Sequence, residues 1–319
     1  MNHGSPPSPP RKPPPIPGGR RLVALDVGGT SMKGAVLTED LRYLSSLRRP
    51  TPKGEDAVEA VHAAVDALLA EAGGDGAAAI GVAVPGIVDD DTGTAIWSEN
   101  IGWRDVPFRE RLAARTGLPV RVGHDVRAGG TAELVLGAAR GARDALIVPI
   151  GTGLSAAVVI DGRLCVAGGY AGELGHIPVG GAAGGADEPC VCGATGCLEA
   201  VASAAAIGRR FTRRTGREAT AATVAALAAE GDPDAAAVWA DAVEHLAAAL
   251  VAATALLGPE VIVIAGGLSE AGALLMDPLR DSVRRRLTFH RPPRLVRARH
   301  GQDAGRLGAA LWARDLLPG

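Results

Sequence analysis

Two stretches of the chain share one order of apolar runs and polar turns. Residues 21–47 hold three apolar runs, and the first turn between them is Gly-Gly-Thr at 28–30. Residues 145–168 repeat this order, with a Gly-Thr-Gly turn at 151–153 followed by Asp161–Gly162. Asp-Gly between apolar runs is typical of a β-hairpin. The pattern predicts a three-stranded meander in each of two domains, although two unrelated meanders can share these features.

The rest of the chain alternates between helical and strand periodicity. Apolar residues at helical spacing, such as Val58, Val61, Val65 and Leu68, predict a helix, and short β-branched runs predict buried strands. Because the chain has 319 residues and single cores seldom exceed roughly 250, we expect an α/β fold of two domains. Expected helices cover 55–72, 108–116, 127–139, 202–214, 221–229, 233–257 and 303–316, and expected strands begin at 80, 119 and 260.

Composition narrows the classes of function. Apolar residues make up 47% of the chain and charged residues 21%, with a formal net charge of −2. This balance recruits neither a nucleic acid nor a membrane surface, and aromatic residues, at 3%, offer few stacking platforms for bases. We therefore expect a globular protein with no nucleic-acid partner and no membrane partner.

Residues 1–20 hold eight prolines and lack the apolar segment of a secretion signal. Such a segment buries too little surface to offset its ordering entropy, so we expect a disordered Pro-rich tail. No apolar run reaches the roughly 18 to 20 residues of a membrane span without Gly or charge interruptions. Since paired cysteine spacing is also lacking, the sequence favours a reducing cytoplasm.

Three glycine turns follow apolar runs, at 28–30, 151–153 and 266–267. Glycines let the backbone approach a phosphate, Thr30 can donate a hydroxyl, and Asp26 at the end of its strand can orient a hydrated Mg²⁺. Neither a P-loop motif nor a Rossmann glycine motif opens a helix in this sequence. A plain hairpin explains one such turn equally well, but three together suggest a nucleotide held between two domains.

Three of the four cysteines lie in the segment Cys190-Val-Cys-Gly-Ala-Thr-Gly-Cys197, and the histidine nearest upstream is His176. Cys-x-Cys spacing makes a poor disulfide and is not a Cys-x-x-Cys redox motif. Three thiolates and one imidazole nitrogen make a closed tetrahedral zinc site, which leaves no position for a substrate. We therefore predict a structural Zn²⁺ bound by His176, Cys190, Cys192 and Cys197.

Several of these segments together resemble a known family. Asp26-VGGTSMKGAV, Ala83-VPGIVD, Gly151-TG, Gly172-ELGH and Cys190-VCGATGCLEA are similar to the signature set of the ROK family, most closely its bacterial glucokinase-like sugar kinases. The resemblance covers about residues 21–317. It implies a two-domain actin-like, ribonuclease-H-like fold, with ATP, Mg²⁺ and a hexose in the cleft between the domains.

The resemblance also implies roles for individual residues. Asp125 corresponds to the general base that accepts the proton of the attacking sugar hydroxyl; without the family match, an N-cap of the following helix is the better interpretation. The implied hexose-binding residues are Gly86, Asn100, His124, Asp125, Glu173, His176 and Glu199. The implied ATP- and Mg²⁺-binding residues are Asp26, Gly28, Gly29, Thr30, Lys33, Gly151, Thr152, Gly153, Gly266 and Gly267.

Two residues beside Asp125 depart from the family pattern. His124 stands where these glucokinases usually have Asn, and its imidazole can donate or accept a hydrogen bond and can carry charge. Arg127 also stands where Asn is frequent, and the sequence offers no account of it. His124 weakens the case for plain glucose as the acceptor.

The sequence therefore predicts an ATP-dependent glucokinase that phosphorylates the C6 hydroxyl, in the cytoplasm, as a homodimer or homotetramer. Kinases for N-acetylmannosamine, N-acetylglucosamine or another amino-hexose are alternatives, as is a sugar-responsive regulator without its DNA-binding domain. The N-terminal domain is expected to span 21–124, completed by a C-terminal helix at 303–317, and the second domain to span 125–302 with the zinc motif. The zinc segment is expected to fix sugar-facing groups and to stay apart from the phosphoryl chemistry.

Overall fold

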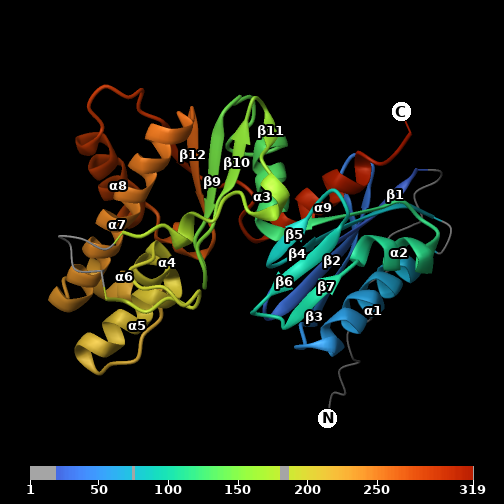
Figure 1. Ribbon diagram of the computed structural model, residues 1–319, viewed down its shortest axis with the longest axis horizontal. Coiled ribbons are helices and arrows are strands. Elements are labelled where there is room, and N and C mark those ends of the chain that lie inside the picture. The colour runs from blue at the N-terminus through green and yellow to red at the C-terminus, as the bar shows by residue number, and fades with distance from the viewer. Residues whose placement is uncertain (1–18, 74–75, 180–186, 319) are drawn as a thin grey trace, which may run out of the picture.

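The computed structural model describes residues 19–73, 76–179 and 187–318. The predicted disordered tail therefore lies almost wholly outside the described residues. Two lobes lie side by side, one from the first part of the chain and one from the second, and the chain returns to the first lobe at its end (Figure 1). Each lobe is built around one five-stranded sheet.

The sheet of the first lobe has the strand order β3-β2-β1-β4-β8. Its first three strands form the antiparallel meander that the apolar pattern predicts, and the other two run parallel to β1. The bounds are β1 (Arg21–Val27), β2 (Ser31–Thr38), β3 (Tyr43–Pro50), β4 (Ala77–Val84) and β8 (Val120–His124).

The sheet of the second lobe repeats this arrangement in the order β11-β10-β9-β12-β13. Here too a meander of three antiparallel strands is followed by two parallel ones. The α/β class and the duplicated meander are thus confirmed, while the domain limits 21–124 and 125–302 stay a prediction. The bounds are β9 (Ala145–Pro149), β10 (Ala157–Ile160), β11 (Arg163–Leu164), β12 (Val261–Ala265) and β13 (Arg294–Arg297).

A small antiparallel sheet in the first lobe was not expected from the sequence. It consists of β5 (Ile87–Asp89), β6 (Thr94–Ser98) and β7 (Trp103–Val106). These strands have three to five residues, and β6 and β7 carry exposed residues among the buried ones, so they lack a clear period-two pattern. The short strand β13 was missed for the same reason.

The helices follow the predicted periodicity, with two corrections at their ends. The predicted helix at 127–139 begins at Asp125 and ends at Val135, because residues 124 and 125 already accept the free N–H group of Val126. The predicted helix at 202–214 begins at Ala204 and ends at Thr215, because Ser203 is extended and caps it by accepting the N–H of Ala206; a short helix before it, Leu198–Ala202, was not predicted. The α-helices are α1 (Glu55–Glu71), α2 (Phe108–Thr116), α3 (Asp125–Val135), α4 (Leu198–Ala202), α5 (Ala204–Thr215), α6 (Ala221–Ala229), α7 (Pro233–Leu257), α8 (Ala273–Arg286) and α9 (Ala304–Arg314), and the 3₁₀ helices are η1 (Ala167–Gly169), η2 (Leu174–His176), η3 (Gly267–Ala271) and η4 (Gly301–Asp303).

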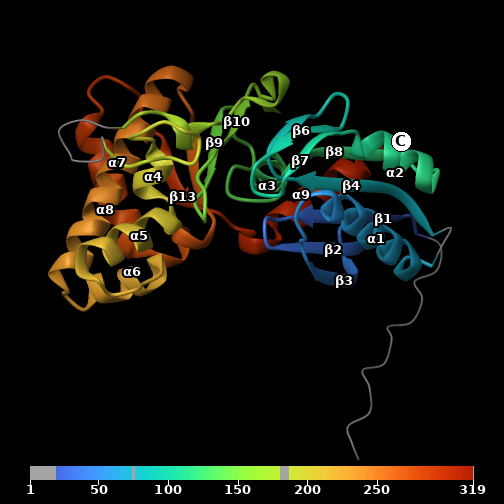
Figure 2. The ribbon, with the colours of Figure 1, turned by 60° about the horizontal axis from the view of Figure 1, so that its bottom comes forward.

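Helices α3 and α9 lie against each other where the two lobes meet (Figures 1 and 2). Glycines permit their close approach: a Cβ atom at Gly308 of α9 would lie 1.8 Å from the carbonyl oxygen of Ala128, and one at Gly81 would lie 1.9 Å from that of Ala309. Trp312 of α9 is buried with Ala24 and Ala83 of the first sheet. The C-terminal helix therefore packs on the first lobe.

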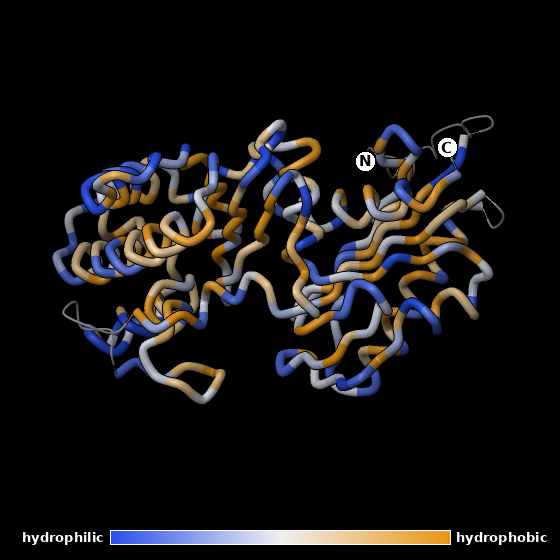
Figure 3. The backbone as a smooth tube through the Cα atoms, turned by 45° about the horizontal axis from the view of Figure 1, so that its top comes forward, coloured by the Kyte–Doolittle hydropathy of each residue, from blue (hydrophilic) through white to orange (hydrophobic). Residues whose placement is uncertain are grey.

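The core of the second lobe is apolar on both the sheet and the helices (Figure 3). Within the described residues, α7 alone is long and apolar enough to pass a length-and-composition test for a membrane span. Its Trp239, Leu246 and Leu250 are buried against the other helices of this core. Because the core helix of a globular lobe passes the same test, α7 is weak evidence for a membrane span.

Candidate functional site

Asp125 is the first residue of α3, directly after strand β8. Its Oδ1 accepts the N–H of Val126 at 2.8 Å, and the ring Nδ1 of His124 accepts the same N–H at 3.3 Å. His124 is the residue in the N-cap position, so the capping role that the sequence offered for Asp125 is shared with its neighbour. The side chain of Asp125 keeps 30% of its surface accessible, which leaves the carboxylate open to a ligand.

Asp125 and Asp26 are both carboxyl groups with raised pKa values. Desolvation raises the pKa of Asp125 to about 6, opposed by the Val126 N–H and the positive charge of Arg127. Desolvation also raises the pKa of Asp26 to about 7, and the negative charge of Asp125 adds to this shift. The structure thus brings the predicted base and the predicted magnesium-binding carboxylate close enough to influence each other.

His124 is a neutral imidazole at physiological pH. Burial, together with the cation of Arg127, lowers its pKa to about 4, so the charge that the sequence allowed for is absent. Because Nδ1 accepts a hydrogen bond from Val126, the ring proton is on Nε2, 3.4 Å from Oδ1 of Asp125. His124 therefore presents a donor to the site, whereas Asn would present a donor and an acceptor.

The carboxylate of Asp26 lies at the start of α9. A Cβ atom at Gly305 would lie 2.5 Å from its carboxyl carbon, so only glycine leaves room for Asp26 there. Lys33 faces Asp26 across the β1–β2 pair, and its positive charge lowers the Asp26 pKa. Gly305 was missed in the sequence, since one glycine in an apolar helix carries no local signal.

The β1–β2 turn, which contains Gly28, Gly29 and Thr30, is held by the segment after β3. The hydroxyl of Thr51 donates to Gly28 O at 2.7 Å, and Nζ of Lys53 donates to Gly29 O at 3.1 Å. Lys53 also donates to the carbonyl oxygen of Asn100. This segment, which the sequence did not single out, thus joins the predicted nucleotide turn to the loop with the predicted sugar contact Asn100.

The second and third glycine turns lie side by side at the ends of the parallel neighbours β9 and β12. Gly266 has φ 75°, and a Cβ atom there would lie 2.5 Å from Ile150 O, directly before the Gly151–Gly153 turn. The carboxylate of Glu199 accepts the N–H of Leu154 at 2.8 Å, at the end of that turn. The segment after the cysteines therefore holds a predicted nucleotide turn, contrary to the expectation that it would serve sugar-facing groups alone.

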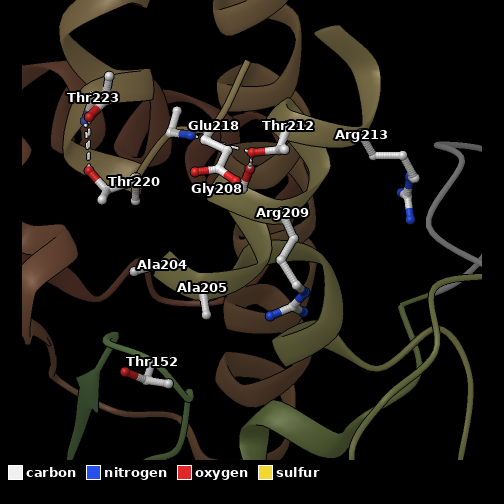
Figure 4. Close-up of a pocket in the computed structure, with 12 residues that line it drawn as sticks. Thr152, Ala204, Ala205, Gly208, Arg209, Thr212, Arg213, Glu218, Thr220 and Thr223 are labelled. Atoms are coloured by element: carbon white, nitrogen blue, oxygen red, sulfur yellow. Dashed lines mark hydrogen bonds between the residues drawn. The ribbon is translucent and has the colours of Figure 1, made fainter. Parts of the chain in front are cut away.

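A cavity of about 940 Å³ opens beside Thr152 on the second lobe. Figure 4 shows Thr152 at one end, Glu218, Thr212 and Thr220 at the other, and the side chain of Arg209 between them. The N–H of Ala204, at the start of α5, donates to Gly151 O at 2.9 Å and so ties this cavity to the turn. Neither Asp26 nor Asp125 lines it.

The remaining predicted sugar contacts lie on two loops. Gly86 has φ 104°, and a Cβ atom there would lie 2.1 Å from Trp97 O, so the chain geometry itself requires this glycine. Glu173 precedes η2, and its Oε2 lies 3.9 Å from Nε2 of His176. In the part of the chain that the structure describes, the side chain of Asn100 makes no hydrogen bond to this group. A common sugar site stays a prediction for Gly86, Asn100, His124, Asp125, Glu173, His176 and Glu199.

The four predicted metal ligands converge. One donor atom from each of His176, Cys190, Cys192 and Cys197 lies within 4.8 Å of the other three. Nδ1 of His176 is 3.6 Å from the sulfur of Cys190, and the sulfurs of Cys192 and Cys197 are 3.7 Å apart. A tetrahedral zinc with bonds of about 2.3 Å requires ligand separations of about 3.8 Å, so the donor set fits Zn²⁺. All four cysteines are free of disulfides, as predicted.

Comparisons with known proteins agree with this arrangement. The model of the ROK family matches residues 22–316. A glucokinase of Halalkalibacterium halodurans is 35% identical over 285 residues, 82% of this chain and 84% of that protein. The crystal structure of a ROK family glucokinase from Streptomyces griseus in complex with glucose and AMPPNP matches with a TM-score of 0.79 at 31% identity, covering 92% of this chain and 99% of that one. An N-acetylglucosamine repressor of Escherichia coli O157:H7 is 32% identical over 218 residues, 64% of this chain and 52% of that protein.

Proposed function

Because this chain belongs to the ROK family, we propose that it is an ATP- and Mg²⁺-dependent hexose kinase that phosphorylates the C6 hydroxyl, with glucose as the acceptor. The observation that carries the proposal is the pair Asp125 and Asp26. Asp125 is an accessible carboxylate with a pKa of about 6, and Asp26 is a half-buried carboxylate with a pKa of about 7 beside a glycine turn.

In this proposal Asp125 is the general base. It takes the proton of the C6 hydroxyl while that oxygen bonds to the γ-phosphorus, and the bond from the γ-phosphorus to the bridging oxygen of ADP breaks. A carboxylate with a pKa of about 6 is ionised at pH 7 and is still basic enough to accept this proton. Bound Mg²⁺ would neutralise the phosphate oxygens, and the carboxylate of Asp26 suits its preference for oxygen ligands.

The nucleotide would bind between the lobes. Its phosphates would face the backbone N–H groups of the turn at Gly28–Thr30 in the first lobe and of the turns at Gly151–Gly153 and Gly266–Gly267 in the second. Its base and ribose would occupy the cavity between Thr152 and Glu218, whose volume of about 940 Å³ is within the usual range for ligand pockets. The absence of Asp125 from this cavity agrees with a nucleotide whose reacting end alone reaches the base.

Zn²⁺ bound by His176, Cys190, Cys192 and Cys197 is a structural cofactor in this proposal. With Nδ1 of His176 among the sulfurs, its Nε2 faces Glu173, a carboxylate–histidine arrangement that orients a metal ligand. The repeated sheets support the actin-like fold with lobes near 21–124 plus 303–317 and 125–302. A cytoplasmic homodimer or homotetramer completes the proposal.

Because His124 lies beside the proposed base, amino-hexoses are the alternative acceptors. An imidazole with its proton on Nε2 donates and does not accept, so it recognises an oxygen lone pair on the sugar. A hydroxyl and an N-acetyl carbonyl both offer one. N-acetylmannosamine, N-acetylglucosamine and glucosamine therefore belong in the same assay as glucose.

The test is ADP release with each of these sugars, measured by a coupled assay. Asp125→Ala is expected to lower turnover with the best sugar by about 10²- to 10⁴-fold, while zinc content and sugar binding persist. Asp91→Ala, an exposed aspartate after β5, is the matched control and should keep full turnover. Substantial turnover in Asp125→Ala would contradict the base. Sugar binding with no ADP release from any sugar would favour the regulator hypothesis.

A further inference from the structure

Arg127, the third residue of α3, is almost wholly buried, with a side chain that is 2% exposed. It donates to both carboxylate oxygens of Asp90, through Nη2 at 2.8 Å and Nε at 3.2 Å. Asp90 is itself 9% exposed. The residue for which the sequence offered no account is therefore one half of a buried, two-point ion pair.

Arg127 also joins three segments of the chain. Its Nη2 donates to Val88 O of strand β5 at 2.9 Å, and its Nη1 lies 3.5 Å from Gly169 O of η1. Gly169 has φ 97°, and a Cβ atom there would lie 2.6 Å from Val88 O. Because η1 follows β11 of the second sheet and β5 belongs to the first lobe, Arg127 lies where the two lobes touch at the base of α3.

Simple packing does not favour an arginine at this position. The N-terminal turn of a helix repels positive charge, and burial of an unpaired guanidinium costs several kcal/mol. The negative charge of Asp90 offsets both effects. Each of the two buried charges is therefore tolerated only because the other is present. A buried pair of this kind is weak evidence for stability and better evidence for a fixed geometry.

The groups that Arg127 faces are those of the proposed site. Its positive charge lowers the pKa of both His124 and Asp125, whereas the negative charges of Glu173 and Asp90 raise the pKa of His124. Asp26, on β1, is the other charged group coupled to Asp125. The charge of Arg127 thus acts on both His124 and Asp125.

We propose that Arg127 and Asp90 form a positioning pair, which fixes the first turn of α3 against the contact between the lobes and sets the charge environment of His124 and Asp125. This role rests on the proposed kinase function for its catalytic readout. In this role neither residue touches the substrate.

The test uses the opposite charges of the two partners. Arg127→Gln removes the cation and leaves Asp90 unpaired, so the acidic limb of the kcat profile for the hexose reaction should move to higher pH by about 1 unit. Asp90→Asn leaves the cation unneutralised, so the same limb should move to lower pH. Both variants should lose thermal stability, and Arg127→Lys should keep the limb in place but lower kcat, because an ammonium group cannot make the two-point contact.

The pKa of the His124 ring, measured by NMR, gives a readout that needs no turnover. Its signal is identified by its absence in His124→Asn, and its pKa should rise in Arg127→Gln and fall in Asp90→Asn. Glu244→Gln is the matched control: it removes the charge of an ion pair between α7 and α8, in which Nη2 of Arg286 lies 2.6 Å from Oε2 of Glu244, in the second lobe away from α3 (Figure 1). It should lower stability and move neither readout.

Loss of stability in both variants with an unchanged His124 pKa would overturn the proposal and leave the pair as a structural bridge. A shift of the His124 pKa in the same direction in both variants would also overturn it. Absence of turnover in the wild-type protein would contradict the kinase function alone, since the NMR measurement would still decide the role of the pair.

Discussion

The β1–β2 and β9–β10 turns occupy the same place in two sheets of the same strand order, yet they are held in different ways. The first turn follows a strand that carries its own acid, Asp26, and it is bonded by Thr51 and Lys53 from the same lobe. The second turn has no acidic residue of its own and accepts support from Glu199, which follows the last cysteine. The same backbone arrangement is therefore stabilised in a different way in each lobe.

The difference separates the groups proposed to act in the reaction from the groups that hold a binding turn in place. In the first lobe the charged groups belong to the strands and are fixed by the backbone of α9 packing on them. In the second lobe the turn offers its backbone groups and the Thr152 hydroxyl, and the segment that carries the predicted metal ligands supplies the carboxylate that positions them. Changes around the first turn should therefore affect catalysis, and changes around the second should affect binding.

Among the changes around the two turns, the largest effect is expected from Gly305→Ala. Its new Cβ atom would lie 2.5 Å from the carboxyl carbon of Asp26, so the carboxylate must leave its position at the start of α9. We expect kcat to fall by about 100-fold or more, as for loss of a positioned metal ligand. Steady-state kinetics with varied Mg²⁺ concentration would measure this.

Gly129→Ala is the matched control on the facing helix. Its Cβ atom would meet Ala304 at 3.7 Å, an ordinary contact, so the substitution should keep activity and add about 0.5–1 kcal/mol of stability. Equal kcat values in the two variants would show that the position of Asp26 does not matter.

A smaller effect is expected when the metal site is broken. Cys192→Ser, or removal of the metal by a chelator, should raise the KM for the hexose, because His176 and Glu173 lose their fixed positions. It should also raise the KM for ATP, because Glu199 follows Cys197 by two residues and holds Leu154 N–H at the second turn. Each KM should rise by about 3- to 10-fold. Titration of both substrates, together with thermal unfolding, would measure these changes.

Glu199→Gln separates the two routes. It keeps the four predicted metal ligands and removes the negative charge beside the turn. The KM for ATP should therefore rise, whereas zinc content and thermal stability should change less than in Cys192→Ser. An unchanged KM for ATP in both variants would contradict the link between the metal segment and the second turn.

The sequence predicted what depends on local pattern. The meanders and most helix bounds follow from periodicity, and the structure has both; spacing also predicted the four metal ligands, whose side chains the structure brings together. It missed what depends on contacts between distant segments: the space at Gly305 for Asp26, the bond from Glu199 to Leu154, and the partner of Arg127. Asp90 and Arg127 are separated by 36 intervening positions and by several elements, so nothing local in the sequence pairs them. The short strands β5–β7 escaped because three to five residues are too few to show a period.

The smallest effect concerns stability, and its sign is opposite in the two lobes. Burial raises the pKa of Asp26 to about 7, so its protonated form favours folding at low pH, and this contribution is lost as pH rises from about 4 to 7. Asp26→Asn should therefore unfold at a higher temperature than the wild type at pH 8, by a few degrees, and at the same temperature near pH 4.

Asp232, which caps α7 in the second lobe, has a pKa lowered by the N–H of Ala235 and by Arg217, so its contribution to stability is present at neutral pH and lost in acid. Asp232→Asn should unfold at a lower temperature at pH 8, with the difference closing toward pH 3. Thermal unfolding of both variants without Mg²⁺ or nucleotide would measure these differences. A shift of the same sign in both variants would contradict the prediction, because it would show that the charge of Asp26 stabilises the folded protein, as the charge of a purely structural carboxylate does.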